Sequence, residues 1–128
     1  MWNVNKEMLS KNFNREEMQC RCGCGAGDIS MDLIRRLQEV RDAIGEPMII
    51  SSGVRCASHN GNPSVGGSVG SSHLTGNATA VDIACISTVY RQKLLKAIMP
   101  VFDRCGVAKS FIHVDVDPNK IAGVCWLY

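Results

Sequence analysis

Residues 71–82 read SSHLTGNATAVD and place an imidazole, His73, and a carboxylate, Asp82, at the two ends of a short loop that contains a glycine. Further along the chain, residues 109–116 predict a strand, and the alternation of side chains along it fixes the face from which His113 projects. Two histidines and a carboxylate, with a fourth position left to water, are the coordination expected of a catalytic zinc site. The sequence therefore predicts zinc ligands at His73, Asp82 and His113.

Length and composition indicate one domain without an obvious polymer partner. The 128 residues are enough to bury a core but too few for a second domain of ordinary size, so residues 1–128 are predicted as a single domain. The 14 basic and 12 acidic residues are scattered, and no run of lysine or arginine predicts a nucleic-acid partner. The longest apolar runs, at residues 47–50 and 121–128, fall far short of the roughly eighteen residues that span a bilayer. We expect no membrane insertion, and we expect a monomer.

Seven cysteines are many for this length, and their odd number leaves at least one outside any disulfide scheme within a monomer. A reducing compartment fits best, and the first residues lack the apolar core of a secretory signal, so we expect synthesis into the cytoplasm. Cys20, Cys22 and Cys24 alternate, with one residue between neighbouring cysteines, whereas structural zinc sites usually have about two to four residues between paired cysteines. Two interpretations stay open: a second bound metal, or a glycine-rich turn whose small thiols pack under the N-terminal helix.

Capping residues delimit three predicted helices. Asn14, with Glu17 three positions later, forms a capping-box pattern that opens a helix over residues 15–19. Ser30 and Ser87 cap the two longer helices, over residues 31–44 and 88–99.

Four strands complete the predicted element order, at residues 47–52, 80–85, 109–116 and 121–128. The last strand is expected to pair with the third as a hairpin through a turn at residues 117–120. This order predicts an α+β domain with a small, mainly antiparallel sheet and with the helices packed on one face.

A glycine-rich stretch, residues 53–70, precedes the His73 segment and is predicted as a functional loop because long loops in small domains usually carry function. Arg55 lies at its start, where a guanidinium can hold a substrate carboxylate through two parallel hydrogen bonds. The alternative for Arg55 is a surface salt bridge. His59, the third histidine, is a rival metal ligand for which the loose surroundings favour a supporting or solvent-exposed role.

Several separated motifs carry a resemblance to a known family. In chain order they are Ser52-Gly53-x-Arg55, Asn60, Val65-Gly66-Gly67, Ser71-x-His73-x-x-Gly76-x-Ala78, Asp82-Ile83 and Ile112-His113-Val114-Asp115. Together they resemble the zinc D-alanyl-D-alanine peptidases, above all the small members found as phage endolysins and bacterial peptidoglycan peptidases. The opening residues 9–13, Glu17 and the cysteine turn resemble the start of those members, so the likeness covers nearly the whole chain.

The resemblance implies a Zn²⁺ ion held by His73, Asp82 and His113, a substrate carboxylate held by Arg55, and hydrolysis of peptide bonds that involve D-alanine in peptidoglycan. Carboxypeptidase and endopeptidase activity both stay open, as does action on the cell wall after release by a phage. One alternative is a catalytically idle cell-wall-binding or phage structural module of the same fold. A weaker alternative is a redox or metal-storage protein built on the cysteines.

Three positions depart from the family pattern. The first histidine and the aspartate are normally seven positions apart, whereas Asp82 lies nine beyond His73. Val54 stands where an aromatic residue often precedes the arginine, and Ser110 stands where many relatives carry an acidic general base.

Asp115 is the residue that the sequence offers in place of that acid. It lies two positions after His113, on the same face of the predicted strand. We predict Asp115 as the general base, which takes a proton from zinc-bound water. Its alternative role is to accept the free ring N–H of a zinc-bound histidine and so fix the tautomer.

Overall fold

A five-stranded sheet forms the centre of the computed structural model, which describes residues 7–60, 71–74 and 78–128 except the side chains of residues 57 and 59. The strands are β1 (Ile50–Ser52), β2 (Ala80–Ala84), β3 (Arg104–Val107), β4 (Phe111–Asp115) and β5 (Val124–Leu127). Their order in the sheet is β1-β2-β4-β3-β5, and every pairing is antiparallel except the parallel pair of β3 with β5. The α+β class and the mainly antiparallel sheet are confirmed.

Side-chain caps begin the helices as the sequence predicts. The helices are α1 (Arg15–Met18), α2 (Met31–Ile44), α3 (Ala57–Asn60) and α4 (Thr88–Ile98). The Asn14 side chain accepts from the Glu17 backbone N–H at 3.0 Å while the Glu17 carboxylate accepts from the Asn14 N–H at 2.8 Å, which completes the capping box. Ser30 and Ser87 cap α2 and α4 in the simpler way, each with its hydroxyl.

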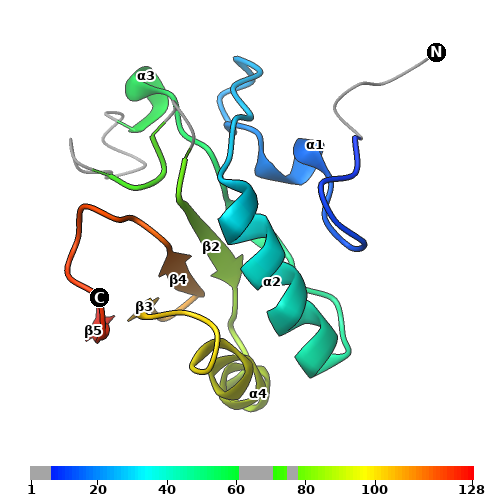
Figure 1. Cartoon of the computed structure of the whole chain (residues 1–128), viewed down its shortest axis with the longest axis vertical. Helices are drawn as coiled ribbons and strands as arrows, with labels where there is room; N and C mark the ends of the chain where they lie inside the picture. Colours follow the sequence, from blue (N-terminus) through cyan, green and yellow to red (C-terminus); the bar gives the residue numbers. More distant parts are fainter. Residues whose placement is uncertain (1–6, 61–70, 75–77) are drawn as a thin grey trace.

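The two faces of the sheet differ in chemistry. Val81 and Ile83 of β2 and Ile112 and Val114 of β4 are fully buried in one apolar core, which α2 and α4 complete. Figure 1 shows α2 and α4 lying against each other, with β5 at the far edge of the sheet. Because side chains alternate along a strand, residues 82, 113 and 115 project from the opposite face. Helices α2 and α4 thus cover one face, and the polar candidates share the other.

The C-terminal strands are connected differently from the predicted hairpin. β5 does not pair with β4; it lies parallel to β3, with Trp126 opposite Gly106. The hairpin partner of β4 is β3, through a tight turn in which the Ala108 N–H donates to the carbonyl of Phe111 at 3.0 Å. The prediction was wrong because β3 has only four residues, among them an arginine and a glycine, and so lacks the apolar alternation that marks a strand.

Two smaller differences concern the segment around Arg55. The first strand covers only Ile50–Ser52, with an irregular register against β2, and not the whole of residues 47–52. The start of the predicted loop forms the short helix α3, and residues 61–70 lie outside the described part. Among the helices that the structure describes, none has the length and apolar character to cross a bilayer.

Candidate metal centre

The sheet register brings two of the three proposed ligands face to face. Asp82 on β2 is the cross-strand partner of His113 on β4, and its Oδ1 lies 3.0 Å from His113 Nδ1. His73 comes from the segment before β2, and its Nε2 lies 3.3 Å from Asp82 Oδ1 and 3.3 Å from His113 Nδ1. All three residues are buried. The structure therefore gathers His73, Asp82 and His113 into one cluster.

The outer nitrogen of each histidine ring is held by an acceptor. His73 Nδ1 lies 2.7 Å from the carbonyl oxygen of Gly53, and a carbonyl can only accept. His113 Nε2 lies 2.7 Å from Asp115 Oδ2, which accepts as a carboxylate. In the neutral form of each ring the proton therefore sits on the outer nitrogen. The two inner nitrogens, His73 Nε2 and His113 Nδ1, carry lone pairs and face each other.

This donor set fits a zinc ion. Two lone pairs and a carboxylate oxygen that converge in a buried site repel one another unless a cation or a proton lies between them. With Zn–N and Zn–O bonds of about 2.0–2.2 Å, neighbouring ligands of a tetrahedral ion lie about 3.3–3.6 Å apart. The three ligand atoms here are separated by 3.0 to 3.3 Å. Three protein ligands leave one tetrahedral position for water or substrate, as in catalytic zinc sites.

The close approach of the three side chains shifts the pKa values of Asp82 and His113. Burial alone raises the pKa of Asp82, but hydrogen bonds and charge from the two histidines outweigh burial and lower it well below the ordinary value. Burial alone lowers the pKa of His113, but hydrogen bonds to Asp115 and Asp82 outweigh burial and raise it. Without a metal the site thus favours a carboxylate paired with a protonated His113, which means that a metal ion must compete with a proton.

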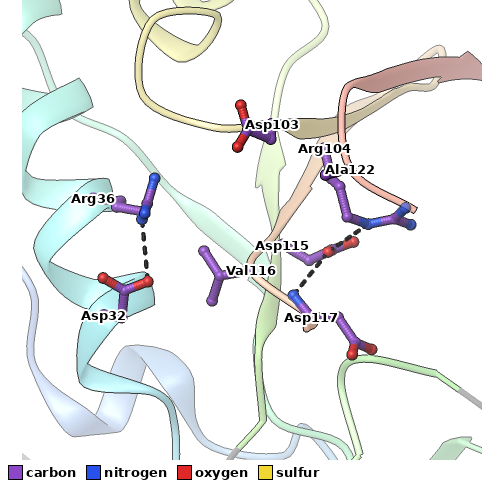
Figure 2. Close-up of a pocket in the computed structure, with 8 residues that line it drawn as sticks. All are labelled: Asp32, Arg36, Asp103, Arg104, Asp115, Val116, Asp117 and Ala122. Carbon is purple, nitrogen blue, oxygen red and sulfur yellow. Dashed lines mark hydrogen bonds and ion pairs between the residues drawn. The ribbon is translucent and has the colours of Figure 1, made fainter. Parts of the chain in front are cut away.

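Asp115 has both carboxylate oxygens engaged. Oδ2 accepts from His113 Nε2, while Oδ1 accepts from Arg104 Nε at 2.7 Å and from the Asp117 backbone N–H at 3.1 Å. Figure 2 shows the last two bonds converging on Asp115 from β3 and from the turn after β4. The Asp115 side chain is 1% exposed. Burial raises its pKa, but these hydrogen bonds and the His113 charge lower it overall, so the carboxylate stays ionised.

Arg55 lies beside the ligand carboxylate. Its Nη2 donates to Asp82 Oδ2 at 3.2 Å, its Nε to Ser52 Oγ at 3.1 Å and its Nη1 to Asn60 Oδ1 at 3.4 Å. The Arg55 side chain is 12% exposed, so the pair with Asp82 is not a surface salt bridge. With the described residues the guanidinium makes three long single contacts and no two-pronged pair, so a carboxylate that forms two parallel bonds is a better partner than these.

An aromatic wall that the sequence did not predict lies next to His113. The ring of Trp126 on β5 is 5.4 Å from that of His113, and the Arg104 guanidinium lies 4.9 Å from the Trp126 ring centre. The indole crosses over Gly106, where a Cβ atom would lie 2.5 Å from Trp126 Nε1. A side chain at this position of β3 would therefore displace the indole, which favours glycine here.

The segment that carries His73 is held at both ends. The Arg55 backbone N–H donates to the His73 carbonyl at 2.6 Å, and the Ser72 hydroxyl donates to Asp117 Oδ2 at 2.7 Å. The Thr79 backbone N–H donates to the Ser72 carbonyl at 2.8 Å, which joins the start of β2 to the His73 segment. The ligand atoms meet even though Asp82 lies nine positions beyond His73, so the longer spacing does not prevent a compact cluster.

A family model described as Peptidase M15 matches residues 11–115, most of the chain and all three clustered residues. The chain belongs to the peptidase M15 family. Comparisons with curated proteins and with solved structures gave no match. Membership in the M15 family agrees with the resemblance that the sequence motifs carry, and the buried His-Asp-His cluster is consistent with a metal site in an M15 chain.

Ser110, at the position of the acid in many relatives, is exposed in the turn before β4. The side chain of His59 lies outside the described residues. The roles of Arg55 and Asp115 stay predictions.

Proposed function

We propose that this chain is a zinc-dependent peptidoglycan peptidase that hydrolyses peptide bonds involving D-alanine in cell-wall stem peptides. One observation carries the proposal: in an M15 chain, two histidine lone pairs and a carboxylate oxygen converge with the spacing of a tetrahedral zinc ion. When bound, zinc supplies Lewis acidity and lowers the pKa of water to about 7. The protein acts as a monomer on a peptidoglycan peptide.

The chain's own residues prepare the site for such an ion. The Gly53 carbonyl and the Asp115 carboxylate fix the tautomers of His73 and His113, so that both inner nitrogens are available as ligands. Asp82 offers Oδ1 to the cluster while Arg55 binds Oδ2, which favours a carboxylate that binds metal through one oxygen.

Of the two roles open to Asp115, the geometry favours orientation of His113. A general base must reach the proton that it abstracts within hydrogen-bond distance or through one water. Asp115 binds the outer edge of the His113 ring, whereas the ligand nitrogen lies on the inner edge. We therefore propose that Asp115 is a positioning residue that holds the His113 proton on Nε2.

Arg55 is proposed to bind the substrate carboxylate. A carboxylate that made two short parallel bonds to the guanidinium would replace the long contacts with Ser52 and Asn60. If that carboxylate is the free end of the peptide, the enzyme trims terminal D-alanine. If the groove is open on both sides, the enzyme cuts cross-links.

Two observations favour the idle-module alternative. Three residues before His113, where the family pattern places an acid, this chain has the exposed Ser110. Both carboxylate oxygens of Asp115 are already engaged in hydrogen bonds. An M15 fold could therefore hold a metal and bind cell wall without turnover.

Digestion of purified peptidoglycan by zinc-loaded protein separates these functions. We expect either released D-alanine or new amino groups at cleaved cross-links, and loss of both in His113→Ala and Asp82→Asn. Protein that carries zinc at the histidine cluster, binds peptidoglycan and releases neither product would reject the peptidase proposal in favour of the idle module.

A further inference from the structure

A second cluster of metal-binding side chains lies outside the histidine site. Cys20, Cys22 and Cys24 come from the turn after α1, and Cys56 lies directly after Arg55, more than thirty positions later in the chain. The four sulfur atoms all lie within 4.8 Å of one another. The fold thus adds a fourth thiol to the three that alternate in the sequence.

The sulfur separations match a bound ion better than a disulfide. Cys20 Sγ lies 3.4 Å from Cys22 Sγ and 3.8 Å from Cys56 Sγ, and the last two sulfurs are 3.6 Å apart. A disulfide bond brings two sulfurs to about 2.05 Å. A tetrahedral zinc ion with Zn–S bonds of about 2.3 Å places its sulfurs about 3.8 Å apart. The observed separations thus approach the edges of such a tetrahedron.

The backbone around the cluster is shaped for this convergence. Gly23 and Gly25 adopt left-handed φ angles of 87° and 86°, which let three alternating cysteines curl toward one point. The Cys20 N–H donates to the Ala26 carbonyl at 2.8 Å and closes the turn. The Cys56 backbone N–H donates to Cys20 Sγ at 3.4 Å, a bond that strengthens when the acceptor sulfur is a thiolate.

We propose that Cys20, Cys22, Cys24 and Cys56 form a structural zinc site, separate from the histidine cluster. Four thiolates in tetrahedral array suit zinc, and four protein ligands leave no position for water, so the site holds structure and performs no hydrolysis. Each ligand must lose its proton when zinc binds, so uptake of the ion releases protons. The proposal does not depend on the peptidase function.

The sulfur site joins the N-terminal segment to the backbone that supports His73. Next to the cysteine turn, the Met18 carbonyl accepts from the Val54 N–H at 2.8 Å, and Gly53 lies so close that an added Cβ would be 2.6 Å from that carbonyl oxygen. The carbonyl of the same Gly53 accepts from His73 Nδ1, and the Arg55 N–H binds the His73 carbonyl. A zinc ion on Cys56 would therefore stiffen residues 53–56, which orient the first histidine ligand.

Metal analysis of reduced protein purified without chelator tests the proposal. We expect two zinc equivalents in the wild type, one in His113→Ala and one in the double variant Cys22→Ser/Cys24→Ser. Cys125→Ser is the matched control, because Cys125 is exposed like Cys22 and Cys24 but lies outside the cluster, and it should keep both equivalents. Circular dichroism establishes that each variant is folded.

Titration with Co²⁺ gives a readout that requires no cysteine variant. His113→Ala should bind one Co²⁺ with the intense near-ultraviolet thiolate-to-metal absorption of a tetrahedral sulfur site, and added zinc should abolish that absorption. A single zinc equivalent in the wild type, lost in His113→Ala and without thiolate absorption for Co²⁺, would overturn the proposal. Iron in place of zinc at the cysteines would overturn the assignment of the metal.

Discussion

Asp115→Asn is the substitution that best separates the two roles of this carboxylate. Asparagine keeps the shape of the side chain and can still accept a hydrogen bond from His113, but it lacks the negative charge that favours a proton on Nε2. It also weakens the 2.7 Å pair with Arg104, whose side chain is 13% exposed. The fold should survive because size and polarity are conserved.

Loss of an orienting partner of a metal-bound histidine typically lowers metal affinity or activity by about ten- to a hundredfold. At about 1.4 kcal/mol per tenfold change, this corresponds to about 1.4 to 2.8 kcal/mol of zinc binding free energy. Loss of a general base instead lowers turnover by about a hundredfold to ten-thousandfold without a change in affinity. Competition of the variant with a chromophoric chelator measures the zinc Kd, and hydrolysis at saturating zinc measures turnover.

Asp103→Asn is a matched control for this measurement. Asp103 is an exposed aspartate that lines the same hollow as Asp115, as Figure 2 shows, so the substitution removes the same charge nearby without touching His113. We expect a raised zinc Kd in Asp115→Asn alone, with activity recovered when zinc is added in excess. An unchanged zinc Kd together with an activity loss of at least a hundredfold would refute the orienting role and restore Asp115 as the base.

The other predictions concern substrate binding, packing and pH. Arg55→Lys should leave zinc content unchanged and lower kcat/KM for peptides that end in a free D-alanine carboxylate by about ten- to a hundredfold, since lysine cannot make two parallel bonds; unchanged kinetics would remove Arg55 from the substrate site. Gly106→Ala should displace the Trp126 indole, with a change in tryptophan fluorescence and a loss of about 1–3 kcal/mol in the free energy of unfolding measured by urea denaturation. In Cys22→Ser/Cys24→Ser, zinc affinity at the histidine site should fall by about tenfold for each pH unit below the raised pKa of His113, because protonated His113 cannot bind zinc. A zinc affinity that stays constant from neutral to mildly acidic pH would contradict that raised pKa.

Sequence patterns predicted those parts of the fold that local chemistry determines. The caps at Asn14, Ser30 and Ser87 are short-range signals, and each one begins a helix in the structure. Alternation along the strand over residues 109–116 placed His113 and Asp115 on the same face, and in β4 the two side chains lie side by side, joined by a hydrogen bond.

The unpredicted parts depend on contacts between distant segments. The four residues of β3 form a strand because β4 and β5 supply partners on both sides, and no local pattern reports that. Arg104 and Trp126 belong to the site only through this pairing. Cys56 joins three cysteines more than thirty positions away because the Val54 N–H binds the Met18 carbonyl. The spacing of the cysteines in the sequence does not predict that contact.

The nine-position spacing between His73 and Asp82 illustrates which distances along the chain matter for a metal site. Asp82 and His113 are fixed relative to each other by strand pairing, which does not depend on the loop. His73 is fixed by its own contacts: its ring by the Gly53 carbonyl and its backbone carbonyl by the Arg55 N–H. Of the described residues between the two ligands, Thr79 is bonded back to Ser72, and Ala80 and Val81 pair with β4 as part of β2, so the contacts that position each ligand lie on either side of residues 75–77. The ligand geometry therefore follows from the sheet and from residues 53–55, and the nine-position spacing is compatible with it.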